Sequence, residues 1–425
     1  MEPDFFDAFL PPYPGGRVLG TFDGGSGMTD DAAGLTPANG RIRLIGDTAE
    51  EAFFAYCRDV EAAGFPCRYE FADEGGVYRA FGCGDRFLYA YFVPSEGVVR
   101  LICDRAGLLP ADFAEAGPYA PESGAALMQF GLYYSEMVKG TTCDCGMMYV
   151  LRLPNGEFVI VDGGEREQAT DAAVEEFLTR IRALAGGDNF TVALWFCTHP
   201  HDDHMDFFIK LLRVCRDTMT VRRLMFNFPA MGLLGNADAA VYAARLRARL
   251  GQCCAHVPFL QPHTGERFCI GGAEFRVLLT HEDVLHADGR AYRGVNETST
   301  VLKIDFAGQS LLLLADIPEE NAEKLLARYR IPTLACTYLQ AAHHCINRLE
   351  ELYKNVPADL VLIPEELNII KDRMRDNFAV ICRYHQPETI YCSGNGTVVF
   401  SVRNGGTVKT ERFPVVGGAY DGSEL

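Results

Sequence analysis

The chain has 425 residues, of which 48% are hydrophobic and 23% charged, the balance of an ordinary globular protein with room for two domains. Its formal net charge of −18 repels polyanions at long range, so long nucleic acid is an unfavourable partner. No apolar run is long enough to span a bilayer, and the acidic start at residues 1–4 lacks the basic and apolar parts of a signal peptide. We therefore expect a cytoplasmic protein with no membrane partner and with reduced cysteines.

The first 40 residues are rich in Gly, Pro and Asp, which predicts an irregular segment over residues 1–40. Residues 41–116 instead show short apolar runs around one amphipathic stretch. The predicted elements are a strand at 42–45, a helix at 48–63 and strands at 67–71, 77–81, 87–92 and 98–103. This order indicates an α+β accessory domain, which either shapes the substrate site or serves oligomerisation.

A Gly- and Pro-rich link at 117–124 precedes a second domain, predicted over residues 126–425. Its first predicted elements are strands at 126–134, 147–153 and 157–161, a helix at 168–184 and a buried strand at 192–197. Alternating strands and helices are the order expected of a sheet covered by helices.

The segment that follows the buried strand is the most informative part of the chain, and residues 198–204 read THPHDDH. His199 and His201 lie two residues apart, so their imidazoles point to the same side of an extended backbone. Asp203 and His204 follow, where the strand should turn into a helix. Four side chains of metal-ligand type this close together predict a site for a pair of metal ions. The alternative is a polar turn with solvated histidines.

Further polar side chains follow other apolar strands. Asp162 ends the strand at 157–161 and precedes two glycines, which suit a sharp turn. Asp316 follows the apolar run 311–314, where its two oxygens could each face one cation. The alternative role for Asp316 is to cap the helix that begins near Pro318.

The spacing His-x-His-x-Asp-His resembles the signature of the metallo-β-lactamase fold superfamily. The resemblance implies an α/β protein built as a four-layer αβ/βα sandwich. It also implies a first metal ion on His199 and His201, and a second site that begins with Asp203 and His204. His201 stands where the di-iron flavoprotein oxidases have Glu, which argues against oxygen or nitric oxide reduction.

The resemblance extends to the later strand ends. It implies that Asp162 orients a ligand loop rather than binding metal, and that Asp316 bridges the two ions. One of His343 and His344, after the strand at 338–342, should complete the second site. Alignment with the family favours His344, and the other histidine would then support the ligands or contact the substrate.

The first site lacks a third histidine, and Asn296 stands in its place. Because an amide oxygen is a poor zinc ligand, we expect the first cation to bind more weakly and to be completed by water or by Asn296. Neither His281 nor His286 is expected to bind metal. Over residues 127–403 the later motifs resemble the ComEC-type metallo-hydrolases, although Cys345 and Ile346 stand where that branch has Gly-Ser.

These features predict a metal-dependent hydrolase that uses a metal-bound hydroxide, with two divalent ions, zinc first and Mn or Fe as alternatives. Asp203 and Asp316 are the predicted catalytic residues, since Asp316 would bridge the ions and Asp203 would hold the attacking water. The branch resemblance favours a phosphodiester, and the acidic charge favours a small or short one. The alternatives are a hydrolase of a lactone, thioester or β-lactam, and a non-catalytic metal-binding or scaffold protein.

Two other groups are weaker candidates for function. Cys143-x-Cys145 and the pair Cys253-Cys254 lack the spacing of a zinc knuckle, so we expect no metal on them. Four arginines after the metal motif could form a basic cleft, but a solvated surface explains them more simply. They are Arg213, Arg216, Arg222 and Arg223.

Overall fold

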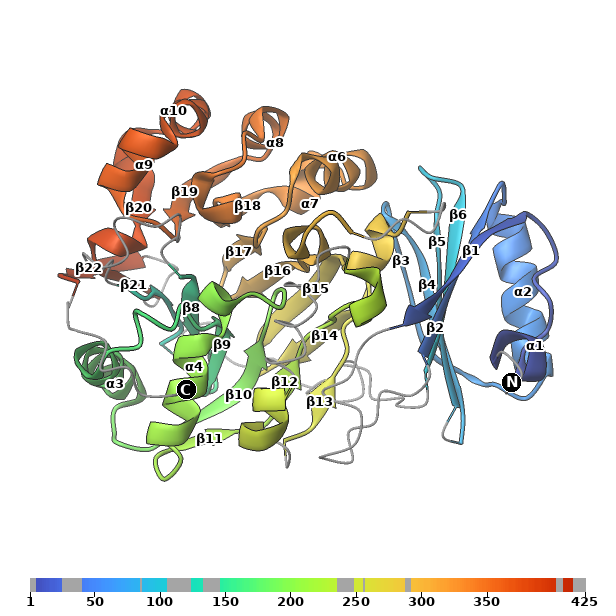
Figure 1. The fold of residues 1–425 in the computed structure, drawn as a ribbon, viewed down its shortest axis with the longest axis horizontal. Helices are drawn as coiled ribbons and strands as arrows, with labels where there is room; N and C mark the ends of the chain where they lie inside the picture. The colour runs from blue at the N-terminus through green and yellow to red at the C-terminus, as the bar shows by residue number, and fades with distance from the viewer. Residues whose placement is uncertain are drawn as a thin grey trace.

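The computed structural model describes residues 5–24, 40–84, 86–104, 124–132, 146–234, 248–254, 257–286, 292–402 and 408–415. Within these residues the chain forms three β-sheets (Figure 1). One smaller sheet belongs to the N-terminal part, and two larger sheets make up the rest. No helix in the described ranges is both long and apolar enough to cross a membrane.

The N-terminal sheet has six antiparallel strands in the order β1-β2-β6-β5-β4-β3. Its strands are β1 (Arg17–Gly24), β2 (Gly40–Gly46), β3 (Cys67–Asp73), β4 (Gly76–Cys83), β5 (Arg86–Val93) and β6 (Val98–Asp104). Helices α1 (Phe5–Phe9) and α2 (Glu50–Ala62) cover one face, where Phe53, Tyr56 and Val60 of α2 join the core cluster of that side. The predicted α+β unit is therefore present.

Two sequence predictions about this region and the next strand were wrong. The segment expected to be irregular contains α1 and the strand β1, which pairs with β2 along its length. An edge strand is held by backbone hydrogen bonds to its neighbour, so it needs no strong apolar alternation of its own. The strand predicted at 126–134 ends at Gln129, because Gly131 instead lies against Gly396 and donates its N–H to Thr397 Oγ1. The residues at 133–134 lie outside the described ranges.

The two larger sheets make up the second part of the molecule. The first has the order β13-β12-β10-β9-β8-β7-β21-β22, and β11 also pairs with β10. Its strands are β7 (Ala126–Gln129), β8 (Met148–Arg152), β9 (Phe158–Asp162), β10 (Phe190–Phe196), β11 (Met219–Val221), β12 (Leu224–Met225), β13 (Phe259–Leu260), β21 (Thr397–Val402) and β22 (Val408–Phe413). The second has the order β14 to β20. Its strands are β14 (Arg267–Ile270), β15 (Ala273–Leu279), β16 (Val301–Phe306), β17 (Gln309–Leu313), β18 (Cys336–Gln340), β19 (Ala358–Ile363) and β20 (Ile390–Cys392).

These two sheets pack face to face, and helices cover their outer faces (Figure 1). The core between the sheets joins Tyr149 and Phe196 of one sheet to Phe275 and Tyr338 of the other. The α-helices are α3 (Asp171–Ala185), α4 (Asp206–Val214), α6 (Glu319–Arg328), α7 (Ile331–Leu334), α8 (Glu350–Asn355), α9 (Leu367–Arg373) and α10 (Arg375–Tyr384). Helices α3 and α4 cover the first sheet, and α6, α8 and α10 cover the second. The result is the four-layer αβ/βα sandwich that the resemblance implied.

Short 3-10 turns connect several strands and carry many of the polar residues. They are η2 (Asp202–His204), η3 (Met231–Leu233), η4 (His281–Val284), η5 (Val295–Thr298), η6 (Ala342–Cys345), η7 (Pro387–Thr389) and η8 (Ser393–Asn395). Strand β9 is parallel to β10, and β17 is parallel to β18. Because parallel strands end at the same edge of a sheet, the turns after these four strands meet at one edge of the sandwich.

The free face of the N-terminal sheet packs against the second part of the molecule. Tyrosine hydroxyls make this contact: Tyr69 donates to the Gly265 carbonyl, and the buried Tyr89 and Tyr91 donate to the Thr264 carbonyl and to Asp283. The link predicted at 117–124 lies almost wholly within residues 105–123, which are outside the described ranges. The predicted domain boundaries, and the role of the N-terminal unit in shaping the substrate site or in oligomerisation, stay predictions.

Candidate metal centre

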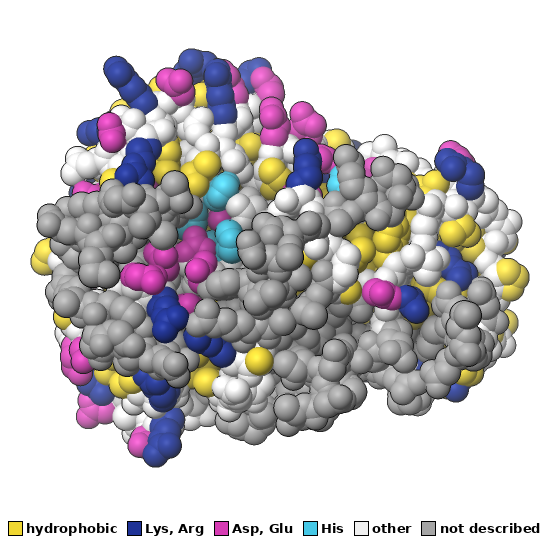
Figure 2. Space-filling model, viewed as in Figure 1, with side chains coloured by type: hydrophobic (Ala, Val, Ile, Leu, Met, Phe, Trp, Pro, Cys, Tyr) yellow, Lys and Arg dark blue, Asp and Glu magenta, His cyan; other side chains and the backbone are white. Residues whose placement is uncertain are grey.

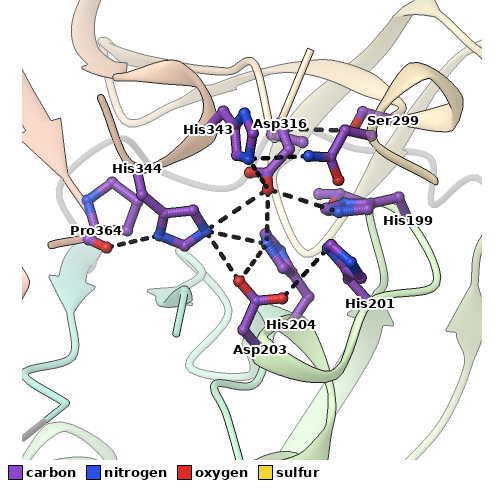
Figure 3. A network of polar contacts seen from close by, with 12 residues as sticks. His199, His201, Asp203, His204, Ser299, Asp316, His343, His344 and Pro364 are labelled. Carbon is purple, nitrogen blue, oxygen red and sulfur yellow. Dashed lines mark hydrogen bonds and ion pairs between the residues drawn. The ribbon is translucent and has the colours of Figure 1, made fainter. Parts of the chain in front are cut away.

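Histidine and aspartate side chains converge at the edge where β9, β10, β17 and β18 end (Figure 3). Two groups of possible ligands share Asp316. One group is Asp203, His204, Asp316 and His344; the other is His199, His201 and Asp316. In each group the ligand atoms lie within 4.8 Å of one another. Figure 2 shows histidine side chains in a hollow of the surface, with acidic side chains beside them.

The carboxylate of Asp316 is the centre of the cluster. Its Oδ2 lies 3.4 Å from His204 Nε2, 3.6 Å from His344 Nε2 and 3.7 Å from His199 Nε2. Asp203 lies on the other side of the same histidines, with Oδ2 3.2 Å from His344 Nε2. The predicted convergence of these residues is therefore confirmed, because the 3.4 Å between Asp316 Oδ2 and His204 Nε2 is within the roughly 4.4 Å that two ligands of one ion can span.

The unpaired polar atoms of this cluster fit a divalent cation. Several buried atoms have no hydrogen-bond partner within the described part of the chain, which is costly unless another group satisfies them. They are His199 Nε2, His201 Nδ1, Asp203 Oδ1 and both carboxylate oxygens of Asp316. Two ligands that each lie about 2.1 Å from one tetrahedral ion are about 3.4 Å apart, which matches the separations between the Nε2 and carboxylate atoms. The donor set of imidazole and carboxylate also suits such an ion.

Asp162 contacts the cluster through the ring nitrogen of His204 that points away from Asp316. It is fully buried, has a left-handed φ of 55°, and accepts a hydrogen bond of 2.7 Å from His204 Nδ1. It also accepts from the backbone N–H and the hydroxyl of Thr198, each at 2.8 Å. Because His204 donates through Nδ1, the neutral form of the ring presents the lone pair of Nε2 toward Asp316. This placement behind the ligands is the one that the resemblance implied.

The same logic sets the tautomers of His199 and His344. His344 Nδ1 donates to the Pro364 carbonyl at 2.8 Å, which leaves Nε2 as an acceptor facing the two aspartates. The Thr198 hydroxyl gives its proton to Asp162, so it accepts from His199 Nδ1 at 3.1 Å. In its neutral form, each of these histidines therefore turns an unprotonated Nε2 toward the place where a cation would bind.

The two adjacent histidines of η6 reach the same cluster because of an unusual backbone. His343 and His344 have φ/ψ of 48°/54° and 51°/27°, and Cys345 has a φ of 69°. Left-handed conformations cost about 1–2 kcal/mol for each residue that has a Cβ. His344 is fully buried and belongs to the first group, whereas the side chain of His343 is 18% exposed and belongs to neither group. His343 Nε2 instead accepts a 2.9 Å hydrogen bond from Asn296 Nδ2.

Burial and charge shift the pKa values of the cluster in opposite directions. Burial, together with the nearby charge of His204, holds the pKa of His199 well below 6.5. Burial also opposes charge on His204 and His344, but the carboxylates of Asp203 and Asp316 outweigh it and raise both pKa values well above 6.5. The same histidines lower the pKa values of the two aspartates, against the effect of burial. The carboxylates thus hold protons on His204 and His344, and a cation would take the place of those protons.

Gln340 and Ser299 hold the backbone around Asp316 in place, a role that the sequence reading did not assign to them. Gln340 is buried, and its Oε1 accepts from Leu314 N at 2.8 Å and from Ala315 N at 2.6 Å, which fixes the turn before Asp316. The Ser299 hydroxyl accepts from Asp316 N at 3.2 Å. A single Gln within the apolar strand 336–340 was the available signal for Gln340, since a buried amide must find partners.

The remaining candidates lie elsewhere. His281 is buried and bonds to Tyr292 and Asn227, and neither it nor His286 belongs to a metal-ligand group within the described residues. Cys143 and Cys145 lie outside the described ranges, and Cys253 and Cys254 form no disulfide.

Two of the four arginines that follow the metal motif pair with acidic residues at the surface. Arg216 pairs with Asp217, and Arg222 pairs with Glu157, with both arginine side chains largely exposed. The expected solvated surface is confirmed for these two residues.

No protein-family model matches the sequence, and no curated protein matches it. Solved structures similar to this chain include a diphosphatase of the PhnP family, with 14% identity and a TM-score of 0.36 over 65% of this chain and 98% of that chain. Unliganded yeast PDE1 has 9% identity and a TM-score of 0.30 over 63% of this chain and 86% of that one. A metallo-β-lactamase from Staphylococcus aureus subsp. aureus COL has 12% identity and a TM-score of 0.29, over 60% and 66%. Identities and TM-scores this low assign no activity to this chain.

The fold and the cluster together define the class of the molecule. It is a four-layer αβ/βα sandwich with a buried group of His and Asp side chains that fits divalent metal ions. This is the architecture that the resemblance to the metallo-β-lactamase fold implied, while the ComEC-type branch and the role of each ligand stay predictions.

Proposed function

We propose that the protein is a metal-dependent hydrolase that acts on a small phosphodiester. The observation that carries the proposal is the pair of ligand groups that share the buried carboxylate of Asp316. Two groups with one common carboxylate suit a pair of divalent cations, and the imidazole-rich donor set favours zinc, with Mn or Fe as alternatives. His199, His201 and Asp316 would hold one ion, and Asp203, His204, Asp316 and His344 would hold the other.

When bound, divalent cations polarise the substrate and lower the pKa of a coordinated water to about 7. The residues of this chain supply the rest of the chemistry. Asp316 separates the two groups and balances their positive charge. Asp203 Oδ1, 3.5 Å from His201 Nδ1, lies at the more open side, where it can accept a hydrogen bond from an attacking water. The side chains of His201 and His343 are partly exposed, at 37% and 18%, so a substrate would approach the cluster from their side.

The choice of a phosphodiester is supported by the likeness of residues 127–403 to the ComEC-type metallo-hydrolases. The net charge of −18 and the acidic side chains beside the histidines in Figure 2 oppose a long polyanion. A substrate with a single phosphodiester bond carries less negative charge, so this repulsion would weaken its binding less. We therefore expect a small molecule or a short oligonucleotide as the substrate.

The test begins with the metal content of the purified protein, followed by turnover of bis-p-nitrophenyl phosphate beside an ester and a lactone panel. We expect bound divalent metal and phosphodiesterase turnover that exceeds ester turnover. Lactonase or thioesterase activity without phosphodiesterase activity would overturn the proposed substrate class. The assignment as a metal-dependent hydrolase would still hold. A protein with neither metal nor turnover would point to the non-catalytic alternative.

The variant Asp316→Ala removes the shared carboxylate, and we expect it to lose several orders of magnitude in turnover. The matched control is Asp188→Ala, because the Asp188 side chain is 86% exposed and belongs to neither ligand group. A rate for Asp316→Ala within about tenfold of the parent rate would refute the proposed role of the metal centre.

A further inference from the structure

The two ligand groups are unequal in number and in charge. The group around His204 has two imidazoles and two carboxylates, whereas the group around His199 has two imidazoles and one carboxylate. A tetrahedral ion on the His199 group therefore lacks one protein ligand. The nearest unassigned polar pair is Asn296 and His343, which hydrogen-bond to each other beside Asp316.

The orientation of Asn296 leaves its oxygen unused. Asn296 Nδ2 donates to His343 Nε2 at 2.9 Å, while the buried Oδ1 has no hydrogen-bond partner within the described part of the chain. A His343 ring that accepts through Nε2 carries its proton on Nδ1. With the amide turned the other way, its NH₂ group would occupy the buried position that now holds Oδ1, and an NH₂ group cannot ligate a cation. The hydrogen bond to His343 therefore selects the amide orientation that a cation requires.

The backbone holds both partners firmly in place. His343 reaches Asn296 only because of its left-handed φ of 48°, which its N–H stabilises by donating to the Ala315 carbonyl at 2.9 Å. Asn296 lies on η5, and the carbonyl of Glu297 in the same turn accepts from Asn321 Nδ2 at 3.0 Å. Ser299 at the end of η5 accepts from Asp316 N. Asn296, His343 and Asp316 thus belong to one connected set of turns.

We propose that His343 is a positioning residue that orients Asn296, and that Asn296 Oδ1 completes the ligand set of the ion on His199 and His201. This inference rests on the proposed metal centre. The ion on this side has one negative ligand fewer than the other ion and a neutral oxygen in its place, so it binds more weakly and exchanges first. A harder ion such as Mn²⁺ should compete better with Zn²⁺ at this site than at the other one.

The test is a titration of the metal-free protein with Zn²⁺ alone and with Mn²⁺ alone. Isothermal titration calorimetry measures the affinities, and elemental analysis measures the number of ions bound. We expect two classes of site in the parent protein. Asn296→Ala and His343→Ala should each weaken the weaker class by about 10–100-fold and leave the tighter class unchanged. Because His343 acts through Asn296, the double variant should be no weaker than Asn296→Ala alone.

Conservative variants separate positioning from folding. His343→Gln should keep the parent affinity, because Gln Oε1 lies as many bonds from the backbone as His Nε2 and can accept from Asn296. Asn296→Asp should tighten the weaker class by adding a charge. The matched control is the exposed residue Asn368 in the variant Asn368→Ala, which should change neither class.

The outcomes distinguish this inference from the proposed function. Two equal classes of site in the parent protein, or an Asn296→Ala variant with unchanged affinities, would overturn the inference and leave the metal centre standing. A further loss on adding His343→Ala to Asn296→Ala would make His343 itself a ligand and would also overturn it. Failure of the parent protein to bind either metal would remove the proposed function itself.

Discussion

Buried histidines of the cluster carry protons because carboxylates surround them. His204 lies within 3.7 Å of both Asp203 and Asp316, and its Nδ1 bonds to Asp162. Burial alone would make such an imidazole neutral, but the carboxylates raise the pKa values of His204 and His344 well above 6.5. Metal ligation requires the neutral imidazole, so cations and protons compete for the same atoms.

We expect metal binding at pH 7 to release on the order of two protons, one each from His204 and His344. Because both pKa values are raised, these protons are fully bound at lower pH and must be displaced there. The apparent metal affinity should therefore fall as the pH decreases from 7 to 5. Calorimetry in buffers of different ionisation enthalpy measures the release directly, and heats that do not depend on the buffer would contradict the expectation.

At the scale of elements, the end of β9 and the first turn of α4 support each other. Phe208 N donates to the Gly163 carbonyl at 3.0 Å, and Phe207 N donates to the Gly164 carbonyl at 3.2 Å. These bonds satisfy N–H groups that a helix start leaves without partners. Strand and helix can come this close only because Gly163 has no side chain: a Cβ there would lie 2.3 Å from Phe208 Cβ. The turn that carries Asp162 is thus fixed by a helix contact.

Gly163→Ala should therefore destabilise the protein by about 1–3 kcal/mol, because the added methyl must push α4 away from β9. It should also weaken metal binding, since Asp162 immediately precedes this position. Chemical denaturation and metal titration measure the two effects. Gly187→Ala is the matched control, because a Cβ at Gly187 meets nothing within 4 Å. Equal stabilities of the two variants would show that the contact between β9 and α4 is looser than the structure indicates.

At the scale of the whole molecule, a buried ion-pair network joins the N-terminal sheet to the sandwich. Arg328 of α6 is 3% exposed and pairs with Asp283 at 2.7 Å and with Glu96, which follows β5. Arg100 of β6 donates to the backbone carbonyls of Glu282 and Asp283, each at 3.0 Å. Helix α6 begins three residues after Asp316, so the N-terminal sheet is tied to the element that follows the shared carboxylate.

Arg328→Ala should cost about 3–5 kcal/mol, because it leaves Asp283 and Glu96 buried with fewer positive partners. Burial alone would raise the pKa of Asp283. The positive charges of Arg328 and Arg100 outweigh burial, so the pKa lies below its usual 3.8. A depressed pKa gives stability that is present above pH of about 4 and is lost as the pH falls, so the variant should unfold in acid at a higher pH than the parent protein.

Thermal and acid unfolding measure these effects, with Arg348→Ala as the control because the Arg348 side chain is 59% exposed. A loss no larger than that of the control would mean that the network contributes little to joining the two units.

The local parts of the site could be predicted from the sequence because they depend on neighbours along one strand and turn. His199, His201, Asp203 and His204 fall within six residues, and the two-residue spacing of His199 and His201 already places their imidazoles on one side of an extended backbone. The apolar runs before Asp162 and Asp316 likewise indicated strands whose ends meet at one edge. The alternation of strands and helices indicated a sheet covered by helices, and the four layers came from the resemblance to the metallo-β-lactamase fold.

Tertiary contacts decided the remaining features. His343 and His344 are identical in residue type and adjacent in sequence, and their surroundings differ: His344 Nδ1 donates to the Pro364 carbonyl, whereas His343 Nε2 accepts from Asn296. The strand β1 exists because β2 offers it backbone partners. The pairing of Asn296 with His343 joins residues 47 positions apart. Local sequence determines the direction in which a side chain leaves its own strand, but hydrogen bonds between distant segments determine which atoms meet.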